Sequence, residues 1–362
     1  MPANRPDAAW PPPMRDQRER ILIIRLSAIG DVVMASAFVH ALRASWPEAH
    51  ISWLVEPVAA DLLRHNPDID QLIIWPKTRW QRLWRARDFK QLGREVRPFI
   101  AALRQAQYSR TIDLQGLFKS GVWAWLSGAP VRIGLGSREG SAVLMTHRVP
   151  RGGDPLRMGS EYLYLAEQLG LDTAAFCLQV GISAADRQVA AALVQSHAPG
   201  GYIVGCPFTT RPQKHWVEAH WIALAQALEQ RFGLPLVLLG GPGDQQAAQR
   251  ITQGAAVPII DLTGQTSLTQ AAALIAQARL LIGVDTGLTH IGPAFKVPTI
   301  ALFGSTCPYR DAAQDNAVVL YHAFVCSPCR RQPSCEGKFG CMRAIEVAEV
   351  MRHAQRLLGN AS

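Results

Sequence analysis

Residues 280–304 constrain the fold more than any other stretch, because two short apolar runs there flank a segment with helical spacing. Leu280–Val284 and Thr299–Phe303 are each long enough to form a buried strand. Between them, apolar side chains recur at helical spacing, at Leu288, Ile291 and Phe295. Val297-Pro298 ends this pattern. The stretch therefore predicts a strand–turn–helix–strand unit whose helix begins at Leu288.

The same alternation of strands and helices runs through the chain in two series. The first series predicts strands at Ile21–Leu26, Ile51–Val55, Gln71–Trp75, Thr111–Leu114 and Val131–Leu135. The second predicts strands at Tyr202–Cys206, Leu236–Leu239, Ile259–Leu262, Leu280–Val284, Thr299–Phe303 and Val318–His322. Short loops join these elements, so we expect two doubly wound parallel α/β domains, at 20–180 and 181–343. If two such domains face each other, they form a cleft with one ligand on each side.

The two ends of the chain and its composition add further expectations. Residues 1–19 contain five prolines and no periodicity, which predicts a disordered tail, and a last helix is expected at 344–358. The N-terminus lacks the apolar core of a secretory signal, and no apolar run approaches the ~20 residues that span a bilayer. We therefore expect a cytosolic protein. The net charge of +9 favours an anionic partner: a nucleotide, nucleic acid, acidic sugar or anionic membrane face.

Ligands of doubly wound sheets bind beyond the carboxyl ends of the strands, so the loops there are the first place to look for a site. In the turn Asp285-Thr286-Gly287, backbone N–H groups at a helix N-terminus favour a phosphate, and Gly287 permits close approach. Asp285 either caps the helix or holds a sugar hydroxyl. His290, on the first helical turn, either faces an anion or is satisfied within the structure. An ordinary capped turn explains the same residues.

Three further loops carry charged or hydroxyl side chains. Asp31 follows Gly30 at a strand-to-helix turn that lacks the glycines of a dinucleotide fingerprint, so it is either a helix cap or a general base for an acceptor hydroxyl. Thr209, Thr210 and Lys214 form either a diphosphate clamp or a solvated loop. Asp244 follows Gly-Gly-Pro-Gly and either accepts from a ribose diol or caps a helix.

The segment 77–97 is dense in positive charge. Its cations are Lys77, Arg79, Arg82, Arg85, Arg87, Lys90, Arg94 and Arg97, interleaved with Trp80 and Trp84. Such a run is usually a solvated helix face. Arginines beside aromatic residues also suit an acidic sugar, a phosphorylated lipid headgroup or single-stranded nucleic acid.

Four of the seven cysteines have the spacing C-x2-C-x5-C-x5-C, at Cys326, Cys329, Cys335 and Cys341. Four thiolates could hold a metal ion tetrahedrally, but only one pair has the usual ligand spacing. The alternative is a group of reduced or partly buried thiols. We interpret Cys177, Cys206 and Cys307 as small core residues.

Taken together, these motifs resemble the bacterial lipopolysaccharide heptosyltransferases of glycosyltransferase family 9. The matching stretches are RLSAIGDVVMASAFVHAL, TRWQRLWRAR, TIDLQGLFKS, PFTTRPQKHW and GVDTGLTHIGPAF. They occur in a fixed order between Ile21 and Gly304, and the loop around Lys214 is most similar to the heptosyltransferase I form.

The resemblance implies a GT-B fold: two facing Rossmann-like domains, with acceptor binding in the N-terminal and nucleotide-sugar binding in the C-terminal domain. It implies that the segment 344–362 packs back on the N-terminal domain. It also implies an inverting transfer of heptose from ADP-L-glycero-β-D-manno-heptose to a Kdo hydroxyl of Kdo2-lipid A, without an obligatory metal. The enzyme would then be peripheral to the cytoplasmic face of the inner membrane.

The resemblance assigns roles residue by residue. Asp31 would be the base, and Lys214 would bind the diphosphate with Thr209 and Thr210. Asp285 would bond heptose hydroxyls, while Thr286, Gly287 and His290 hold the pyrophosphate region and Asp244 replaces a longer Glu on the ribose. The implied acceptor-binding residues are Lys77, Arg79, Arg82, Gln115 and Lys119. The four-cysteine segment has a parallel in an iron-binding cysteine motif of the related autotransporter heptosyltransferases, so a structural zinc or iron at these thiols is a hypothesis.

Two other functions remain open at this point. One is another family 9 transferase, either similar to heptosyltransferase II or using a different nucleotide sugar. The other is a non-catalytic nucleotide- or nucleic-acid-binding protein that uses the basic segment. Nucleic-acid affinity that falls steeply with salt, without sugar transfer, would distinguish the latter. A basic run alone is weak support for it, so we expect no nucleic-acid partner.

Overall fold

The computed structural model describes residues 18–306, 311–329 and 332–359. The chain forms two compact units, described separately below. Unit 1 is the described part of Met1–Gly153 with Gly159–Gly181, and unit 2 is Asp154–Met158 with the described part of Ile182–Ser362. Of the expected tail 1–19, residues 1–17 lie outside the described residues. Glu19 is buried and pairs with Arg110, so it belongs to the fold of unit 1.

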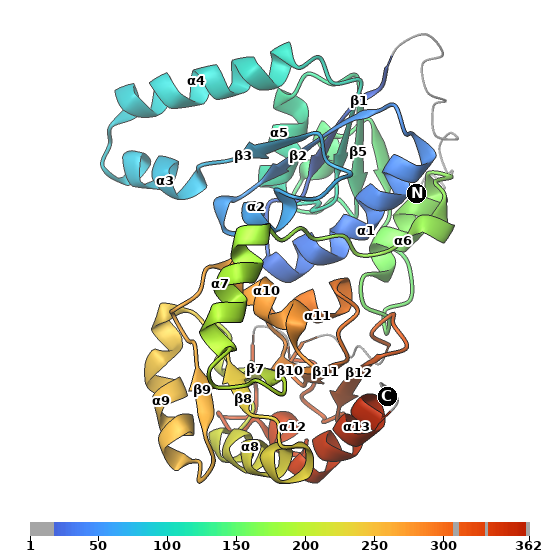
Figure 1. Cartoon of the computed structure of the whole chain (residues 1–362). Helices are drawn as coiled ribbons and strands as arrows, with labels where there is room; N and C mark the ends of the chain where they lie inside the picture. The colour runs from blue at the N-terminus through green and yellow to red at the C-terminus, as the bar shows by residue number, and fades with distance from the viewer. Residues whose placement is uncertain (1–17, 307–310, 330–331, 360–362) are drawn as a thin grey trace. The chain divides into compact units, whose positions relative to one another are not determined.

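Unit 1 contains a six-stranded parallel sheet in the order β3-β2-β1-β4-β5-β6 (Figure 1). Its strands are β1 Arg20–Ile24, β2 His50–Val55, β3 Gln71–Ile74, β4 Arg110–Asp113, β5 Val131–Leu135 and β6 His147–Val149. Its α-helices are α1 Ile29–Ser45, α2 Pro57–Leu63, α3 Lys77–Arg85, α4 Phe89–Gln105, α5 Phe118–Leu126 and α6 Ser160–Gln168. The order reverses beside β1, the arrangement of a doubly wound sheet.

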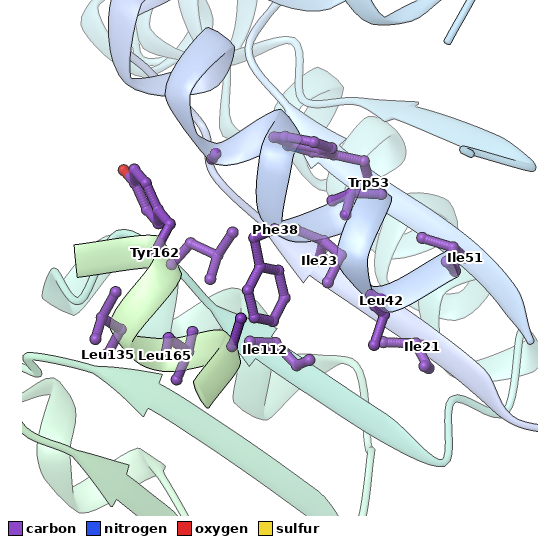
Figure 2. Packing of buried hydrophobic residues seen from close by; sticks show 14 of the residues in the cluster. Ile21, Ile23, Phe38, Leu42, Ile51, Trp53, Ile112, Leu135, Tyr162 and Leu165 are labelled. Carbon is purple, nitrogen blue, oxygen red and sulfur yellow. The ribbon is translucent and has the colours of Figure 1, made fainter. Parts of the chain in front are cut away.

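The central strand β1 is buried on both faces, which explains its continuous apolar sequence. Ile21 and Ile23 point into the core cluster that contains α1, whereas Leu22 and Ile24 point into the cluster beneath α5. Figure 2 shows Phe38 of α1 lying among residues of the sheet in the first of these clusters. Alternate residues of one strand thus hold helices on both sides of the sheet.

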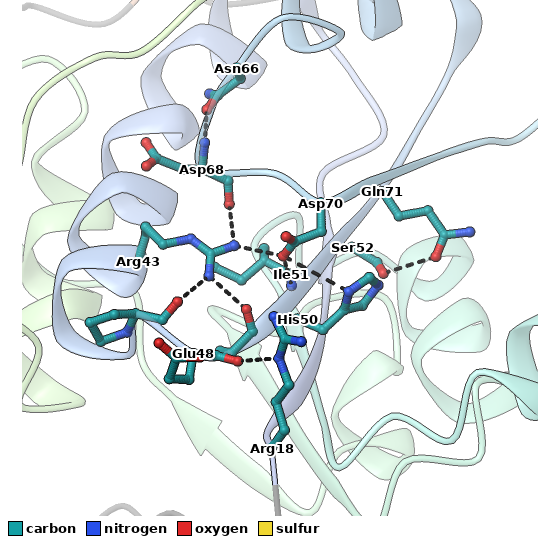
Figure 3. A network of polar contacts seen from close by, with 12 residues as sticks. Arg18, Arg43, Glu48, His50, Ile51, Ser52, Asn66, Asp68, Asp70 and Gln71 are labelled. Carbon is teal, nitrogen blue, oxygen red and sulfur yellow. Dashed lines mark hydrogen bonds and ion pairs between the residues drawn. The ribbon is translucent and has the colours of Figure 1, made fainter.

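A polar network fixes the end of α1 against strands β2 and β3 (Figure 3). Arg43, in the last turn of α1, donates to the carbonyls of Ala49 at 2.6 Å and Asp68 at 3.1 Å and to the Asp70 carboxylate at 2.6 Å. Asp70 also accepts from the Ile51 amide at 2.7 Å. Although burial raises the pKa of Asp70, these bonds from Ile51 and Arg43 lower it on balance.

Unit 2 contains a second six-stranded parallel sheet, in the order β12-β11-β10-β7-β8-β9. Its strands are β7 Ile203–Cys206, β8 Leu236–Leu238, β9 Ile259–Asp261, β10 Leu280–Val284, β11 Thr299–Phe303 and β12 Ala317–Tyr321. Its α-helices are α7 Ala184–Val194, α8 Glu218–Phe232, α9 Gln245–Gly254, α10 Leu268–Gln277, α11 Ile291–Ala294, α12 Gly340–Arg343 and α13 Val347–Gly359. The predicted pair of doubly wound α/β domains is confirmed.

Two helix predictions need correction. The helix expected from Leu288 is only the four-residue α11, which begins at Ile291 and contains Gly292 and Pro293, two poor helix formers. The helix expected at 98–107 begins at Phe89 and includes Pro98, so the basic segment is a pair of helices, α3 and α4.

The last helix, α13, packs in the core of unit 2, and the expected packing of the segment 344–362 on the N-terminal domain stays a prediction. Val350, Ala354 and Leu357 of α13 are buried in the same core cluster as residues of α8, β10 and β11. Figure 1 shows α13 beside α8. The spacing of four and three residues places these side chains on one helix face, and that face is occupied within unit 2.

Among the described residues, no helix combines the length and the apolar character that crossing a bilayer requires.

Candidate functional site

Asp31 lies at the carboxyl end of β1, in the first turn of α1. Its Oδ2 accepts a hydrogen bond from the Ala28 amide at 3.2 Å and lies 2.5 Å from Nη2 of Arg25. The capping contact predicted for this carboxylate is therefore present. The Asp31 side chain nevertheless stays 38% exposed. Both of these contacts use Oδ2, and because no described residue hydrogen-bonds to Oδ1, that oxygen remains for a ligand hydroxyl.

Arg25 is a site residue that the sequence reasoning missed. Its side chain is 7% exposed, and Nη1 donates to the Leu114 carbonyl at 3.1 Å. The guanidinium carbon lies 6.0 Å from the centre of the Tyr162 ring. A buried guanidinium needs a charged partner, and Asp31 supplies it. The available signal was a single cation in the apolar run ILIIRL.

The loop after β4 is organised by the buried carboxylate of Asp113. It accepts from the amides of Gln115 at 2.9 Å and Gly116 at 3.1 Å and from the Ser120 hydroxyl at 2.9 Å. Burial raises the pKa of Asp113 to about 6, and these hydrogen bonds oppose that rise. Gly116 has φ +68°, and a Cβ there would lie 2.4 Å from the Leu135 carbonyl oxygen, so only glycine fits.

Gln115 has a structural role in this part of unit 1. Its Oε1 accepts from the Leu26 amide at 2.9 Å, and the residue is 7% exposed. The bond joins the loops that follow β1 and β4. The carboxamide oxygen of Gln115 is therefore engaged within the fold, rather than free for an acceptor.

The predicted acceptor-binding cations differ in how far their charge is compensated. Glu56 lies between Lys77 and Lys119, at 3.0 and 3.4 Å. Arg79 pairs with Glu95 at 2.6 Å and, together with Gln91, lowers the pKa of Glu95 to about 2. Arg82 is exposed and forms no ion pair within the described part of the chain. Of these four cations, Arg82 alone is uncompensated among the described residues.

In unit 2, Lys214 and Asp285 form the centre of a polar cluster beyond the ends of β7 and β10. Nζ of Lys214 lies 2.6 Å from Oδ2 of Asp285 and donates to the Asp285 carbonyl at 3.4 Å. His290 Nε2 lies 3.7 Å from Oδ1 of Asp285. The Thr306 hydroxyl, which the sequence reasoning missed, donates to Oδ2 at 2.5 Å.

The electrostatics of this cluster favour an ionised Asp285. Burial raises the pKa of Asp285, but the nearby His290 ring and the charge of Lys214 together hold it well below its usual range. The Asp285 and Lys214 side chains are only 16% and 15% exposed. This carboxylate therefore orients the ammonium group, and it does not cap α11.

The turn after β10 differs from the predicted helix start. The Thr286 amide donates to the Val284 carbonyl at 2.7 Å, and the Thr289 hydroxyl donates to the same oxygen at 2.6 Å. Because α11 begins only at Ile291, the expectation that Thr286 and Gly287 present free amides at a helix N-terminus is wrong for Thr286. Both residues remain half-buried beside Asp285.

The remaining predicted donor residues lie in two other loops of unit 2. The Thr209 carbonyl is 2.7 Å from Nε2 of His215; Thr209 is half-buried and Thr210 exposed. Asp244 accepts from the Gly241 amide at 2.8 Å through Oδ2, a bond that caps the 3-10 turn Pro242–Asp244, and its side chain makes no cap bond to α9. Among the described residues, no hydrogen bond or ion pair joins Thr209, Thr210 or Asp244 to the Lys214–Asp285 cluster.

The metal predicted at the four-cysteine segment stays a prediction, for which the described residues give no support. Within residues 18–306, 311–329 and 332–359, no three histidine, cysteine or acidic side chains come together to hold an ion. Burial raises the pKa of the Cys341 thiol, and Cys326, Cys329 and Cys335 add to the rise. None of these four cysteines forms a disulfide within the described residues. Cys206 is buried as predicted, Cys177 is exposed contrary to prediction, and Cys307 lies outside the described residues.

Comparison with known proteins places the chain in a family. The model of "Glycosyltransferase family 9 (heptosyltransferase)" matches residues 96–339. A lipopolysaccharide heptosyltransferase 1 from Pseudomonas aeruginosa is 30% identical over 86% of this chain and 86% of its own length.

Solved structures agree with the fold. A family 9 glycosyltransferase from Veillonella parvula superposes with a TM-score of 0.81 at 25% identity, covering 94% of this chain and 98% of its own. The E. coli heptosyltransferase WaaC with ADP-2-deoxy-2-fluoro heptose has a TM-score of 0.67 at 24% identity, covering 93% and 99%. The two six-stranded parallel sheets of this chain thus match the GT-B architecture of these relatives. The chain belongs to glycosyltransferase family 9, the heptosyltransferase family, and is a glycosyltransferase.

Proposed function

We propose that this enzyme transfers L-glycero-D-manno-heptose from ADP-heptose to Kdo of the lipopolysaccharide inner core, with Kdo2-lipid A as acceptor. The relative from Pseudomonas aeruginosa, a lipopolysaccharide heptosyltransferase 1, supports the reaction. The E. coli structure with an ADP-heptose analogue supports the donor. The observation that carries the proposal is the pairing of a buried cation with an ionised carboxylate at the strand ends of unit 2.

In this proposal, Lys214 stabilises the departing diphosphate. A displacement at the anomeric carbon expels ADP, whose charge grows as the glycosidic bond breaks, and a positioned ammonium group stabilises that charge. Asp285 holds Lys214 at 2.6 Å and keeps it oriented. With a protein cation in this role, we propose that transfer needs no metal ion, so activity should persist in a chelator.

Asp285 also has a proposed part in donor recognition. Its carboxylate already accepts from Thr306 and interacts with Lys214 and His290, so it is fixed before the donor arrives. We assign it, with Thr286, Gly287 and His290, to the heptose and pyrophosphate. Thr209, Thr210 and Asp244 remain proposed contacts to the diphosphate and ribose.

Asp31 is the proposed general base. An inverting transfer needs a base that removes the proton of the acceptor hydroxyl as that oxygen attacks the face opposite the leaving group. Asp31 has an exposed carboxylate whose Oδ2 is held by Arg25 and the Ala28 amide. This arrangement leaves Oδ1 to receive the proton.

The proposed acceptor is a lipid, so we place the enzyme at the cytoplasmic face of the inner membrane, bound peripherally. Unit 1 carries the exposed cations, including Arg82, that suit an acidic sugar or a phosphorylated lipid. Lys77, Lys119 and Arg79 are proposed acceptor contacts only if Glu56 and Glu95 release them. Gln115 shapes the loop through its Oε1, and it remains a proposed acceptor contact through its side-chain NH2 group.

The test is a matrix of donors and acceptors with purified enzyme. ADP-heptose or ADP-glucose is combined with Kdo2-lipid A or with Kdo2-lipid A that already carries one heptose, and the products are weighed by mass spectrometry. The proposal expects one heptose added to Kdo2-lipid A from ADP-heptose, with and without chelator. Transfer only to the heptosylated acceptor would instead indicate a heptosyltransferase II activity, and no transfer from ADP-heptose would refute the proposal.

A further inference from the structure

Helices α3 and α4 form a hairpin whose base is anchored in unit 1. Trp80 of α3 is buried, and its ring centre lies 5.3 Å from that of Phe99 and 5.9 Å from that of Trp123. The Trp80 indole donates to Glu95 of α4 at 3.1 Å, so a side-chain bond ties the two helices together. Figure 1 shows the turn between α3 and α4 extending away from the sheet of unit 1.

The other end of the hairpin, residues 82–94, exposes two large aromatic side chains. We call this segment the hairpin tip. Trp84 is 64% exposed and Phe89 is 54% exposed. Their ring centres are 5.3 Å apart at an interplanar angle of 77°, so the two side chains pack edge-to-face on each other. Two adjacent apolar side chains left in water form a patch that is a candidate contact site for a partner.

The hairpin tip also carries cations that form no ion pair with the described residues. The cations of the hairpin tip are Arg82, Arg85, Arg87, Lys90 and Arg94. All five are exposed, and none forms an ion pair with any described residue. The single acidic residue of the tip, Asp88, accepts from the Gln91 amide at 3.0 Å as the N-cap of α4. By contrast, Lys77 and Arg79 near the base are paired with carboxylates.

The charge of the hairpin is large relative to that of the whole chain. Residues 77–105 contain nine basic and two acidic side chains, a net charge of +7, and the chain has a net charge of +9. The hairpin tip combines two exposed aromatic rings with five exposed cations that form no ion pair among the described residues, and both kinds of side chain suit the surface of an anionic bilayer. Aromatic side chains favour the interface between headgroups and acyl chains, and arginines attract anionic headgroups.

We propose that the hairpin tip is the membrane-docking element, which inserts Trp84 and Phe89 into the interface of an anionic lipid bilayer while its five cations contact lipid phosphates. The inference rests on the proposed function in one respect, since a lipid acceptor gives the enzyme a reason to reach a membrane. Nucleic acid is the competing partner. Its bases stack on open aromatic faces, whereas Trp84 and Phe89 lie edge-to-face against each other.

The test is co-sedimentation with vesicles that contain no acceptor, made of phosphatidylcholine alone or of phosphatidylcholine with phosphatidylglycerol. Wild-type enzyme should bind the anionic vesicles and should dissociate from them as the salt concentration rises. Arg85→Gln/Lys90→Gln/Arg94→Gln should weaken the partition coefficient about 100-fold, because each cation near an anionic surface contributes roughly fivefold. Trp84→Ala/Phe89→Ala should weaken it by at least about tenfold, because burial of each ring is lost.

Matched control variants test whether the effect is specific to the hairpin tip, or whether losing any three exposed arginines or any exposed tryptophan has the same effect. Arg187→Gln/Arg231→Gln/Arg352→Gln removes the same charge from exposed arginines of unit 2 that form no ion pair with described residues. Trp125→Ala removes a 52% exposed tryptophan from α5. Both controls should bind vesicles as the wild type does. If they lose as much affinity as the tip variants, or if the tip variants keep wild-type affinity, the proposal is wrong.

Two further readouts make the result specific. Brominated lipids should quench the wild type more than Trp84→Phe, because Trp84 enters the bilayer; equal quenching would contradict insertion. A single-stranded oligonucleotide serves as the competing partner. If the wild type binds it as tightly as it binds vesicles, and if the tip variants lose that affinity to the same extent, the tip is assigned to nucleic acid instead. Transfer to a deacylated, soluble Kdo acceptor should be unchanged in the tip variants. A wild type that binds vesicles but transfers nothing would overturn the proposed function and leave this inference standing.

Discussion

The contact between Arg25 and Asp31 gives the sharpest stability prediction, because a buried guanidinium depends on the proposed catalytic base. Asp31→Ala removes the carboxylate 2.5 Å from Nη2 of Arg25, and the Leu114 carbonyl remains as a neutral partner. Losing a hydrogen bond to a charged group costs about 1.5–3 kcal/mol. The cost stays below the ~3–5 kcal/mol of a fully buried pair because water reaches the Asp31 side chain, which is 38% exposed.

The assay is a double-mutant cycle read by thermal unfolding. A loss of this size lowers the melting temperature by roughly 3–12 °C for a unit of about 160 residues. Arg25→Met/Asp31→Ala removes both charges, so it should be more stable than the sum of the two single effects by at least about 1 kcal/mol. Single effects that add within ~0.5 kcal/mol would show that the two side chains do not interact, and would refute the reasoning.

Activity separates the structural role of Asp31 from its proposed chemical role. Arg25→Met/Asp31→Ala should regain stability relative to Asp31→Ala yet remain at least about 100-fold below wild type in turnover, the usual scale for losing a general base. Turnover that recovers along with stability would mean that Asp31 acts only by supporting the fold of unit 1.

Three other predictions concern single positions. Gly283→Ala places a Cβ 2.1 Å from Oγ1 of Thr289 and should lower the free energy of unfolding by about 1–3 kcal/mol in a denaturant titration. Gly93→Ala lies within α4 with no atom near the new Cβ and should raise it by about 0.5–1 kcal/mol. A more stable Gly283→Ala than Gly93→Ala would contradict this packing. Burial raises the pKa of Asp113 to about 6. Protonation of Asp113 therefore adds to the free energy of unfolding in full below the unfolded pKa near 4, and this contribution is lost as the pH rises through 6. Asp113→Asn should therefore flatten the stability profile between pH ~4 and ~6, and an unchanged profile would exclude this group as its source. Lys214→Gln should lower turnover at least about 100-fold, because removing one group that stabilises charge in the transition state usually costs that much. A turnover near that of the wild type would show that Lys214 has no part in the reaction.

Much of the fold follows from the sequence because the strands are buried on both faces. Continuous apolar runs such as Ile21–Ile24 and Leu280–Val284 have few alternatives to a central parallel strand. The strand β6, His147–Val149, was not predicted, because three residues of mixed polarity carry no periodic signal. The length of α11 was overestimated because apolar spacing continues through Gly292 and Pro293.

The candidate site was only partly predictable, because its contacts join distant parts of the chain. Spacing at strand ends identified Asp31, Lys214 and Asp285 as candidates. It could not show that Lys214 pairs with Asp285, 71 residues away. Nor could it show that Arg79 is paired with Glu95 while Arg82 is exposed without an ion pair among the described residues. Local sequence gives the residue types of a site, whereas charge compensation depends on side chains that the fold brings together.

The most direct test of the account is the turnover of Asp31→Asn, measured as ADP release with ADP-heptose and Kdo2-lipid A at saturating concentrations. The account predicts a kcat at least about 100-fold below wild type, because an amide cannot take the acceptor proton. It predicts little change in the KM for ADP-heptose, which the residues around Lys214 and Asp285 are proposed to bind. A kcat within about threefold of wild type, in a variant that folds normally, would contradict the proposal that Asp31 activates the acceptor.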